Sequence, residues 1–281
     1  MTKRLSGLLA PYAFYLSPVF YLGRTATYVV EFVGSIGLLL RNTVARSKSG
    51  LVTGRGKRLG RANLWAQMVR VGVKSIGIIS LVVFCIGAIL SLQMQPILNQ
   101  YGATEKIADI IGIAMLRELG PLVAAITLTG FAGASIAAEL GTMQVGEELE
   151  ALQSSAIDPV RFLVVPRVLA TTVMMVCLAV VADLMGVAGG LFVCTGLFKI
   201  APEAYLNATF TAVKTRDFVS GLVKAGVFGA ALSLIACHLG MNVRGGAQGV
   251  GDATTKTVVY TIVALTFIDL GFTAVFYYLG F

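Results

Sequence analysis

Several long, mostly apolar runs constrain this chain more than any other feature of its sequence. A helix needs about 20 apolar residues to cross the ~30 Å hydrocarbon core of a bilayer. Hydrophobic residues make up 57% of the chain and charged residues only 13%, whereas about a quarter of the residues in a soluble domain are charged. The sequence therefore predicts an all-α integral membrane protein.

We expect five transmembrane helices within residues 63–281, preceded by a separate region, residues 1–62. Within that first region, Arg24 and Glu31 are seven residues apart in the apolar stretch 21–40. They would share one helical face, which favours an N-terminal interfacial helix, with a true span as the alternative. A basic cytoplasmic loop should follow it. The five spans are expected near 76–98, 105–138, 162–198, 218–239 and 257–281, with loops at 41–61, 199–217 and 240–256. The third is too long for one untilted crossing, so we expect it to bend, or to project beyond the bilayer, around Gly186, Gly189 and Gly190.

The basic residues are concentrated at the start of the chain. Twelve of the 22 Lys and Arg residues lie between Lys3 and Lys74, before the first long apolar run. Such a region stays in the cytoplasm and is attracted to anionic lipids, so the net charge of +8 does not indicate a nucleic-acid partner. Five spans then place the N-terminus in the cytoplasm and the C-terminus on the extracytoplasmic side. The last two loops do not follow the bias, so this orientation depends on the N-terminal region.

Catalytic and metal-binding patterns are missing from the sequence. The four cysteines have neither CxxC spacing nor a nearby His pair, so they indicate no zinc site or disulfide framework. The lone His238 fits an interfacial histidine better than a catalytic one. The glycine-rich segment 245–251 lacks the Gly-Lys-Ser/Thr ending of a phosphate loop, so we expect ATP to be handled by another subunit. Asp252 is interpreted as the N-cap of the last helix.

An acidic amphipathic segment follows the second expected span. Val145, Leu149 and Leu152 have i, i+4, i+7 spacing and form a short apolar stripe, while Glu147 and Glu148 lie off it. A short helix of this kind can dock into a groove of a soluble partner, or it can be a solvated loop helix. We expect Asp158-Pro159 to end it, because the residue before proline is disfavoured in α geometry.

Ionisable residues inside the apolar runs form the second signal for function. Each costs a few kcal/mol at the bilayer centre on insertion scales, so each should face the bundle interior or water. Lys224 is expected to pair with Asp183, Asp269 or Glu118. Structural ion pairs are the alternative to a functional role. The residues concerned are Arg117, Glu118, Asp183, Lys224 and Asp269.

Three separated motifs occur in order along the chain. They are Leu116-Arg117-Glu118-Leu119-Gly120-Pro121, then Ala138-Glu139-Leu140-Gly141-Thr142-Met143 leading into Glu147-Glu148, then Gly245-Gly246 with Gly249-Val250-Gly251 and Ala253-Thr254-Thr255. On these motifs the chain, from about Asn63 onward, resembles the MlaE-type (MCE-associated) ABC transporter permease family.

The resemblance implies a homodimeric five-span permease in the cell inner membrane. It would pair with two cytoplasmic ABC ATPase subunits, which bind ATP and Mg²⁺, and with a hexameric MCE-domain lipid-binding protein outside. The complex would move phospholipids between inner and outer membranes, and this chain would bind no cofactor and catalyse no covalent chemistry. A permease for another hydrophobic or small solute, and a non-transporting scaffold for the MCE protein, remain open alternatives.

The resemblance also assigns roles to individual residues. Phe131 and Asp252 depart from it, because the family often has Arg at the first position and a basic residue at the second. The short cytoplasmic coupling helix would contact the ATPase through Glu139, Val145, Glu147, Glu148, Leu149 and Leu152. The lipid pathway would include Leu90, Ile97, Leu98, Tyr101, Arg117, Glu118 and Lys224, with Asp183 and Asp269 as further intramembrane charges.

Overall fold

The computed structural model describes residues 13–52 and 57–279, which are helical over nearly their whole length and contain no strand. The chain divides into two units, residues 1–42 and 43–281. The helices are α2 (Ala13–Val52), α3 (Lys57–Val71), α4 (Ile76–Gln100), α5 (Ile107–Ala114), α6 (Gly120–Leu128), α7 (Ala134–Val145), α8 (Glu148–Ser154), α9 (Val165–Gly196), α10 (Pro202–Ala212), α11 (Thr215–Met241) and α12 (Gly246–Tyr278). Shorter 3₁₀ and π turns join them: η3 (Val73–Ser75), η4 (Thr104–Lys106), η5 (Met115–Leu119), η6 (Thr129–Gly133) and η7 (Val160–Val164).

Five helical stretches in the described part of the chain are long and apolar enough to cross a membrane, as expected from the sequence. Helix α2 is not among them. It includes residues 21–40, whose position in the membrane interface stays a prediction. The five stretches are Asn63–Gln100, Thr104–Val145, Val160–Gly196, Thr215–Met241 and Gly246–Tyr278.

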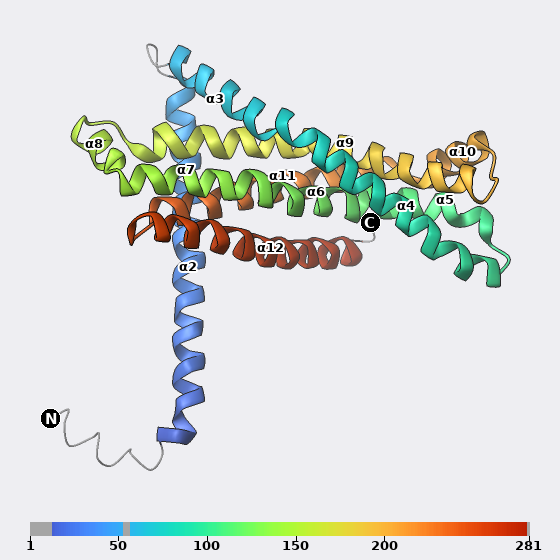
Figure 1. Ribbon diagram of the computed structural model, residues 1–281, viewed down its shortest axis with the longest axis horizontal. Helices are drawn as coiled ribbons and strands as arrows, with labels where there is room; N and C mark the ends of the chain where they lie inside the picture. Colours follow the sequence, from blue (N-terminus) through green and yellow to red (C-terminus); the bar gives the residue numbers. More distant parts are fainter. Residues whose placement is uncertain (1–12, 53–56, 280–281) are drawn as a thin grey trace. The chain divides into compact units, whose positions relative to one another are not determined.

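Helix α9 forms the centre of the second unit, with its main contacts to α4 and α11, and α12 packs on α7 and α11 (Figure 1). Glycines allow the closest of these contacts. A Cβ at Gly87 would lie 2.0 Å from the carbonyl oxygen of Gly186, and a Cβ at Gly189 would lie 2.0 Å from that of Phe84. Helix α9 runs uninterrupted through Gly186, and these glycines serve helix packing. A bend of α9, or its projection beyond the bilayer, stays a prediction.

The second span stays helical through Arg117, Glu118 and Pro121. The π turns η5 and η6 lie between α5, α6 and α7. Pro121 occupies the first turn of α6, directly after η5, where a missing N–H costs little. The charged pair Arg117 and Glu118 is therefore carried on a π turn, a feature often found at functional sites.

Three of the expected loops are largely helical. Of the expected loop 41–61, residues up to Val52 belong to α2 and residues from Lys57 belong to α3. Residues 53–56 lie outside the described residues. Helix α10 occupies most of 199–217, and α12 begins at Gly246 rather than near residue 257. The N-cap of α12 is Gly245, at φ 91°, so the cap expected at Asp252 is wrong. The low helix propensity of glycine suggested a loop in this segment, but tertiary packing overrides such a preference. Here Gly141 of α7 leaves room for Val243 and Val250, so the segment can pack against α7.

The connection after α8 also differs from expectation. Helix α8 ends at Ser154, before Asp158 and Pro159. The Asp158 carboxylate accepts a hydrogen bond from the Val160 amide at 3.0 Å and pairs with Arg46 at 2.7 Å. Asp158-Pro159 therefore starts the next helical segment rather than ending the previous one.

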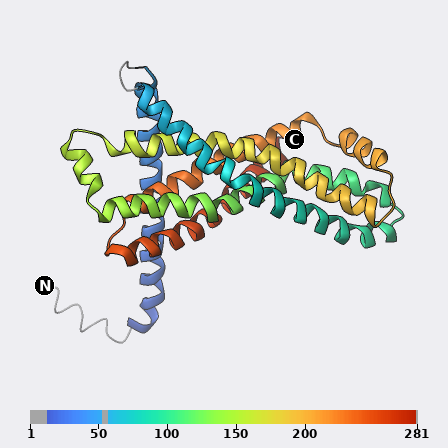
Figure 2. The same ribbon diagram turned by 45° about the horizontal axis from the view of Figure 1, so that its top comes forward.

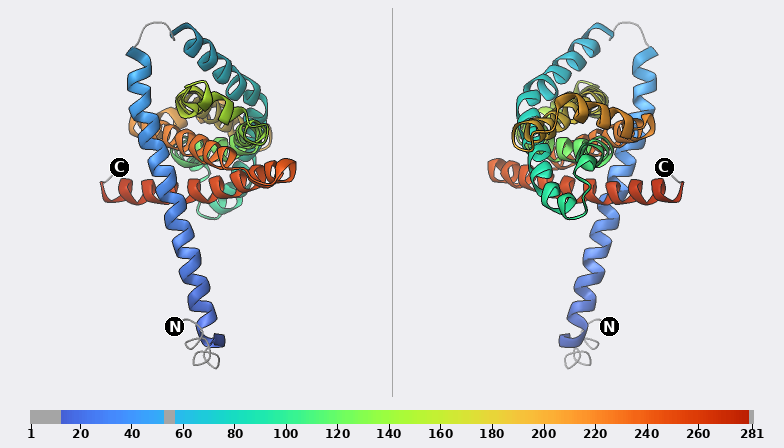
Figure 3. Two further views of the ribbon diagram at one scale, coloured as in Figure 1. Left: turned by 90° about the vertical axis from the view of Figure 1, so that its left-hand side faces the viewer. Right: turned by 90° about the vertical axis from the view of Figure 1, so that its right-hand side faces the viewer.

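The two short helices α8 and α10 lie at opposite ends of the bundle (Figures 1 and 2). Figure 3 looks at the bundle from either end and shows α12 running obliquely along one side of it. The turn expected at 101–104 is present at the α10 end, with Gly102 at φ 64°. Sites built from polar and charged residues can therefore lie at the α8 end, at the α10 end or inside the bundle.

Candidate functional site

A cluster of charged side chains lies inside the bundle around Lys224 of α11. The Lys224 side chain is fully buried, at 0% exposure. Its ammonium donates to Glu118 Oε2, to Asp269 Oδ1 at 2.9 Å and to Thr273 Oγ1 at 3.2 Å. The three N–H donors of the lysine thus have three acceptors, which offsets the cost of burying its charge.

Two carboxylates face this one ammonium, so the cluster carries a formal charge of −1. Glu118 is 28% exposed and Asp269 is 16% exposed, so both lie closer to the surface than Lys224. The Thr273 hydroxyl donates to Glu118 Oε1 at 3.1 Å. The ring of Phe276 lies 5.8 Å from the Lys224 ammonium, within the range of a cation–π contact.

The elements that carry the cluster explain its geometry. Asp269 and Thr273 are four residues apart on α12 and therefore lie on one helical face. Glu118 comes from the π turn η5. Its neighbour Arg117 extends to Asp217 at the start of α11, with 3.8 Å between Nη1 and Oδ1. One π turn thus supplies opposite charges to two places on α11.

Asp183 does not join this cluster. Of the three partners that the sequence offered to Lys224, the structure uses Glu118 and Asp269. Asp183 is 2% exposed, and neither of its carboxylate oxygens has a hydrogen-bond partner. It packs against Gly120, where a Cβ would lie 2.0 Å from Asp183 Oδ1.

The predicted apolar lining of the lipid pathway lies on and just after α4. Leu90 and Leu98 are half-buried and pack against the core of the bundle. Ile97 is 48% exposed and Tyr101 is 80% exposed, so both present apolar surface on the outside of the bundle. Their role in lipid binding stays a prediction.

A second ion cluster, near the α8 end, surrounds Glu139 of α7. Its carboxylate pairs with Arg70 of α3 at 2.6 Å and with Arg167 of α9 at 3.1 Å. Arg70 also donates to the Ser135 hydroxyl at 2.9 Å. Arg167 is 3% exposed, whereas the Glu139 and Arg70 side chains are 32% and 43% exposed, so this carboxylate joins three helices at the edge of the interior.

The surface expected to contact an ATPase is divided between exposed and buried residues. Val145, Glu147 and Glu148 are exposed and Leu152 is half-buried. Leu149 is 3% exposed and therefore packs within this chain. Glu147 joins α7 to α8 in the left-handed region, at φ 59°, and so sets the angle at which α8 leaves the bundle.

Comparison with known proteins decides the family. The family model described as permease MlaE matches residues 64–275. This chain belongs to the MlaE permease family. A probable ABC transporter permease protein of Rickettsia felis is 39% identical over 213 residues, which is 75% of this chain and 82% of that protein. A probable ABC transporter permease protein of Synechocystis is 36% identical over 208 residues, 74% of this chain and 79% of that protein.

A plant protein belongs to the same set of relatives. The chloroplastic protein TRIGALACTOSYLDIACYLGLYCEROL 1 of Arabidopsis thaliana is 32% identical over 215 residues, covering 76% of this chain and 61% of that protein. That protein is named after a glycolipid. The matched region of this MlaE permease contains all five membrane-spanning stretches except the ends of the first and last.

Sequence reasoning missed several members of the two clusters in this MlaE permease. Thr273 could have been found, because it lies four residues after Asp269 on the same helix. Phe276 also follows on that face. Arg70, Ser135 and Arg167 had no signal, since their convergence on Glu139 depends on how α3, α7 and α9 pack. Among the described residues, no group of three or more His, Cys, Asp and Glu could hold a metal ion.

Proposed function

We propose that this MlaE permease is the membrane-spanning subunit of an ATP-driven transporter that moves phospholipids between the inner and outer membranes. The observation that carries the proposal is the buried Lys224 cluster, set among spans that expose large apolar side chains. Apolar surface suits acyl chains, and a few intramembrane charges suit a lipid headgroup. The glycolipid name of the plant relative supports a lipid cargo.

The partners follow from the family and from the chain's own chemistry. Two ABC ATPase subunits on the cytoplasmic side would bind ATP and Mg²⁺ and contact α8. A hexameric MCE-domain protein would receive or deliver lipid on the other side. Two copies of this chain would form a homodimer through apolar surface such as Ile97 and Tyr101. The chain would then supply the path and the coupling, and the partners would supply hydrolysis and lipid storage.

Lys224, Glu118 and Asp269 would act on the headgroup during the conformational change. The cluster has one more carboxylate than ammonium, so a headgroup ammonium can replace Lys224 as a partner of Asp269 or Glu118 while Lys224 meets the phosphate. Exchanging partners in this way keeps each buried charge paired, which low-dielectric surroundings demand.

The test is a lipid-transfer assay with the permease, ATPase and MCE protein reconstituted between two vesicle populations. The variant is the triple neutral form Glu118→Gln, Lys224→Met, Asp269→Asn. Removing only Glu118 and Lys224 would leave Asp269 without its partner, so all three must change together. Transfer should fall by at least tenfold, while insertion, dimer formation and ATPase binding stay normal. Wild-type transfer by this variant would contradict the headgroup role, and no transfer of any phospholipid by the wild-type complex would contradict the proposed function.

A further inference from the structure

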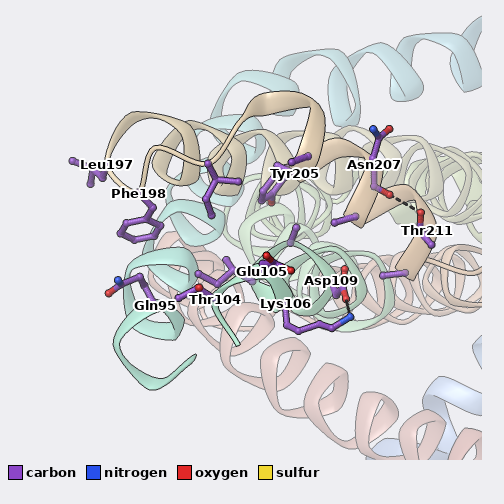
Figure 4. A pocket seen from close by; sticks show the side chains of 16 residues that line it. Gln95, Thr104, Glu105, Lys106, Asp109, Leu197, Phe198, Tyr205, Asn207 and Thr211 are labelled. Atoms are coloured by element: carbon purple, nitrogen blue, oxygen red, sulfur yellow. Dashed lines mark hydrogen bonds and ion pairs between the residues drawn. The ribbon is translucent and has the colours of Figure 1, made fainter. Parts of the chain in front are cut away.

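A cavity of about 1180 Å³ lies at the α10 end of the bundle. It is bounded by the end of α4, by η4 and the start of α5, by the end of α9 and by α10 (Figure 4). None of its lining residues belongs to the Lys224 cluster or to the apolar lining predicted on α4. The first and third apolar stretches end near this level and the second begins there, so we expect the cavity to lie near the boundary between hydrocarbon and headgroups.

The cavity is preformed, because α10 is held firmly against the bundle. Tyr205 of α10 is 1% exposed, and its hydroxyl donates to the Val187 carbonyl at 3.4 Å. Burial raises the pKa of Tyr205, so this hydroxyl remains a donor. A Cβ at Gly190 would lie 2.4 Å from the Tyr205 hydroxyl, and a Cβ at Gly112 would lie 2.9 Å from the Thr209 methyl. Two glycines thus make room for α10 to dock.

The wall of the cavity has an apolar part and a charged part. Phe198 and Ile200, both half-buried, supply apolar surface. On the charged part, Lys106 and Asp109 form an ion pair at 2.9 Å, with side-chain exposures of 68% and 22%. Glu105 lines the same wall (Figure 4). An amphipathic ligand with charges of both signs matches this surface.

We propose that this cavity binds a zwitterionic phospholipid whose headgroup ends in a primary ammonium, such as phosphatidylethanolamine. The lipid phosphate accepts from Lys106, and its ammonium donates to Asp109 and Glu105. The inference rests on the proposed lipid cargo and deepens it by assigning a headgroup class to a second site.

The charges favour this headgroup over the other common ones. Two carboxylates face one lysine, so an anionic phospholipid would meet a wall of net negative charge. A trimethylammonium headgroup can satisfy the charges but has no N–H to donate, whereas charge-assisted hydrogen bonds are the stronger contacts. The apolar wall adds affinity for acyl chains, which a free headgroup lacks.

The experiment measures lipid binding to the full-length permease, purified with its ATPase and stripped of lipid. Native mass spectrometry follows titrations with phosphatidylethanolamine, phosphatidylcholine and phosphatidylglycerol. The wild type should bind phosphatidylethanolamine about tenfold more tightly than phosphatidylglycerol, equal to about 1.4 kcal/mol. The double variant Glu105→Gln, Asp109→Asn should lose this preference. Ala204→Trp should fill the cavity and weaken binding of all three lipids.

Glu203→Gln is the matched control, because Glu203 lies exposed on α10 and does not line the cavity. It should keep the wild-type preference. Equal binding of the three lipids by the wild type, or an unchanged preference in the double variant, would overturn the inference. So would crosslinking of a photoreactive residue at Asn207 to the MCE partner instead of to lipid.

The outcomes separate this inference from the proposed function. Selective phosphatidylethanolamine binding by a complex that transfers no phospholipid would support the cavity and refute the transporter. Normal transfer without selective binding would support the transporter and refute the cavity. Changes in the Lys224 cluster should leave binding in the cavity unchanged, because the two sites share no residue.

Discussion

At the scale of single residues, the interior of this MlaE permease depends on pairing one lysine with two carboxylates. Lys224 has no exposure, and its charge is balanced by Glu118 and Asp269. Removing one member of a buried ion pair leaves an uncompensated charge, which typically costs about 3–5 kcal/mol. Replacing all members by neutral groups costs far less. The stability of the chain should therefore depend on balance within the cluster more than on any one charge.

Lys224→Met should destabilise the folded permease more than Asp269→Asn does. The first change leaves two carboxylates facing each other in the interior, whereas the second leaves Lys224 paired with Glu118. We expect a loss of about 3–5 kcal/mol for Lys224→Met, visible as a lower yield of monodisperse protein and a lower unfolding midpoint in detergent. The triple neutral variant should recover most of that yield. Equal yields for Lys224→Met and wild type would show that the cluster does not stabilise the fold.

The sequence predicted which residues would be charged in the interior, but not how they would pair. The cost of an intramembrane charge singles out Glu118, Lys224 and Asp269 without any structure. The choice of Glu118 and Asp269 over Asp183 depends on how the π turn η5 and helix α12 pack against α11. A π turn has no dependable sequence signal, so this pairing was decided by tertiary packing.

At the scale of helices, α4 and α9 approach closely because glycines face each other. Gly87→Ala would place a Cβ 2.0 Å from the Gly186 carbonyl oxygen, and backbone cannot move aside as a flexible side chain can. We expect about 1–3 kcal/mol of destabilisation, measured as a lower thermal midpoint of the purified permease. Gly77→Ala on the same helix is the control, because nothing lies within 4 Å of its Cβ. A Gly87→Ala midpoint equal to that of Gly77→Ala would contradict this packing.

Helix α8 is the expected contact with the ATPase, and its exposed acidic residues allow a direct test. The double change Glu147→Lys, Glu148→Lys reverses two exposed charges without touching the interior. Like charges placed across an interface cost several kcal/mol, so copurification of the ATPase should fall at least tenfold while the permease stays inserted. Glu203→Lys, on α10 at the other end of the bundle, should keep the ATPase. If the ATPase still copurifies fully with the double variant, the ATPase does not contact α8 through these residues.

Leu149 makes a different prediction, because it is buried in its own chain. Leu149→Asp would place a charge at a position that is 3% exposed, so it should reduce the amount of folded permease itself. The yield of monodisperse permease without its ATPase measures this. An undiminished yield combined with loss of the ATPase would show instead that Leu149 faces the partner.

Helix existence could be predicted from the sequence far better than helix ends. All five spans follow from apolar run length alone, because a bilayer demands it. The glycine-rich segment before residue 257 and the basic segment after residue 40 were expected as loops from composition, yet both are largely helical. Position 249 needs glycine despite its low helix propensity, because a Cβ there would lie 1.9 Å from the Arg244 carbonyl oxygen. Close packing of this kind cannot be read from composition.

At the scale of the whole molecule, five spans require the two ends of the bundle to face opposite sides of the membrane. Helix α8 and the start of α12 belong to one end, and α10 to the other (Figures 1 and 2). By the positive-inside bias, the basic residues before Lys74 would place the α8 end in the cytoplasm. The headgroup cavity would then face away from the cytoplasm, on the side of the MCE partner. This orientation would place α8 on the side of the ATPase and the cavity at the α10 end on the side of the MCE partner.

Cysteine labelling of intact cells tests this arrangement. In a variant without the four native cysteines, Ser154→Cys at the end of α8 should react with a membrane-impermeant maleimide only after the membrane is opened. Ala201→Cys beside α10 should react from outside in intact cells, and both positions are exposed. A cysteine at Ser47 should behave like Ser154→Cys, and one at Phe281, which lies outside the described residues, should behave like Ala201→Cys. Labelling of positions 47 and 281 from the same side would mean an even number of crossings between them, which would contradict the five-span topology. Labelling of Ser154→Cys from outside would show that the orientation in the membrane is the reverse of the one proposed. The ATPase contact would then lie at the α10 end rather than at α8.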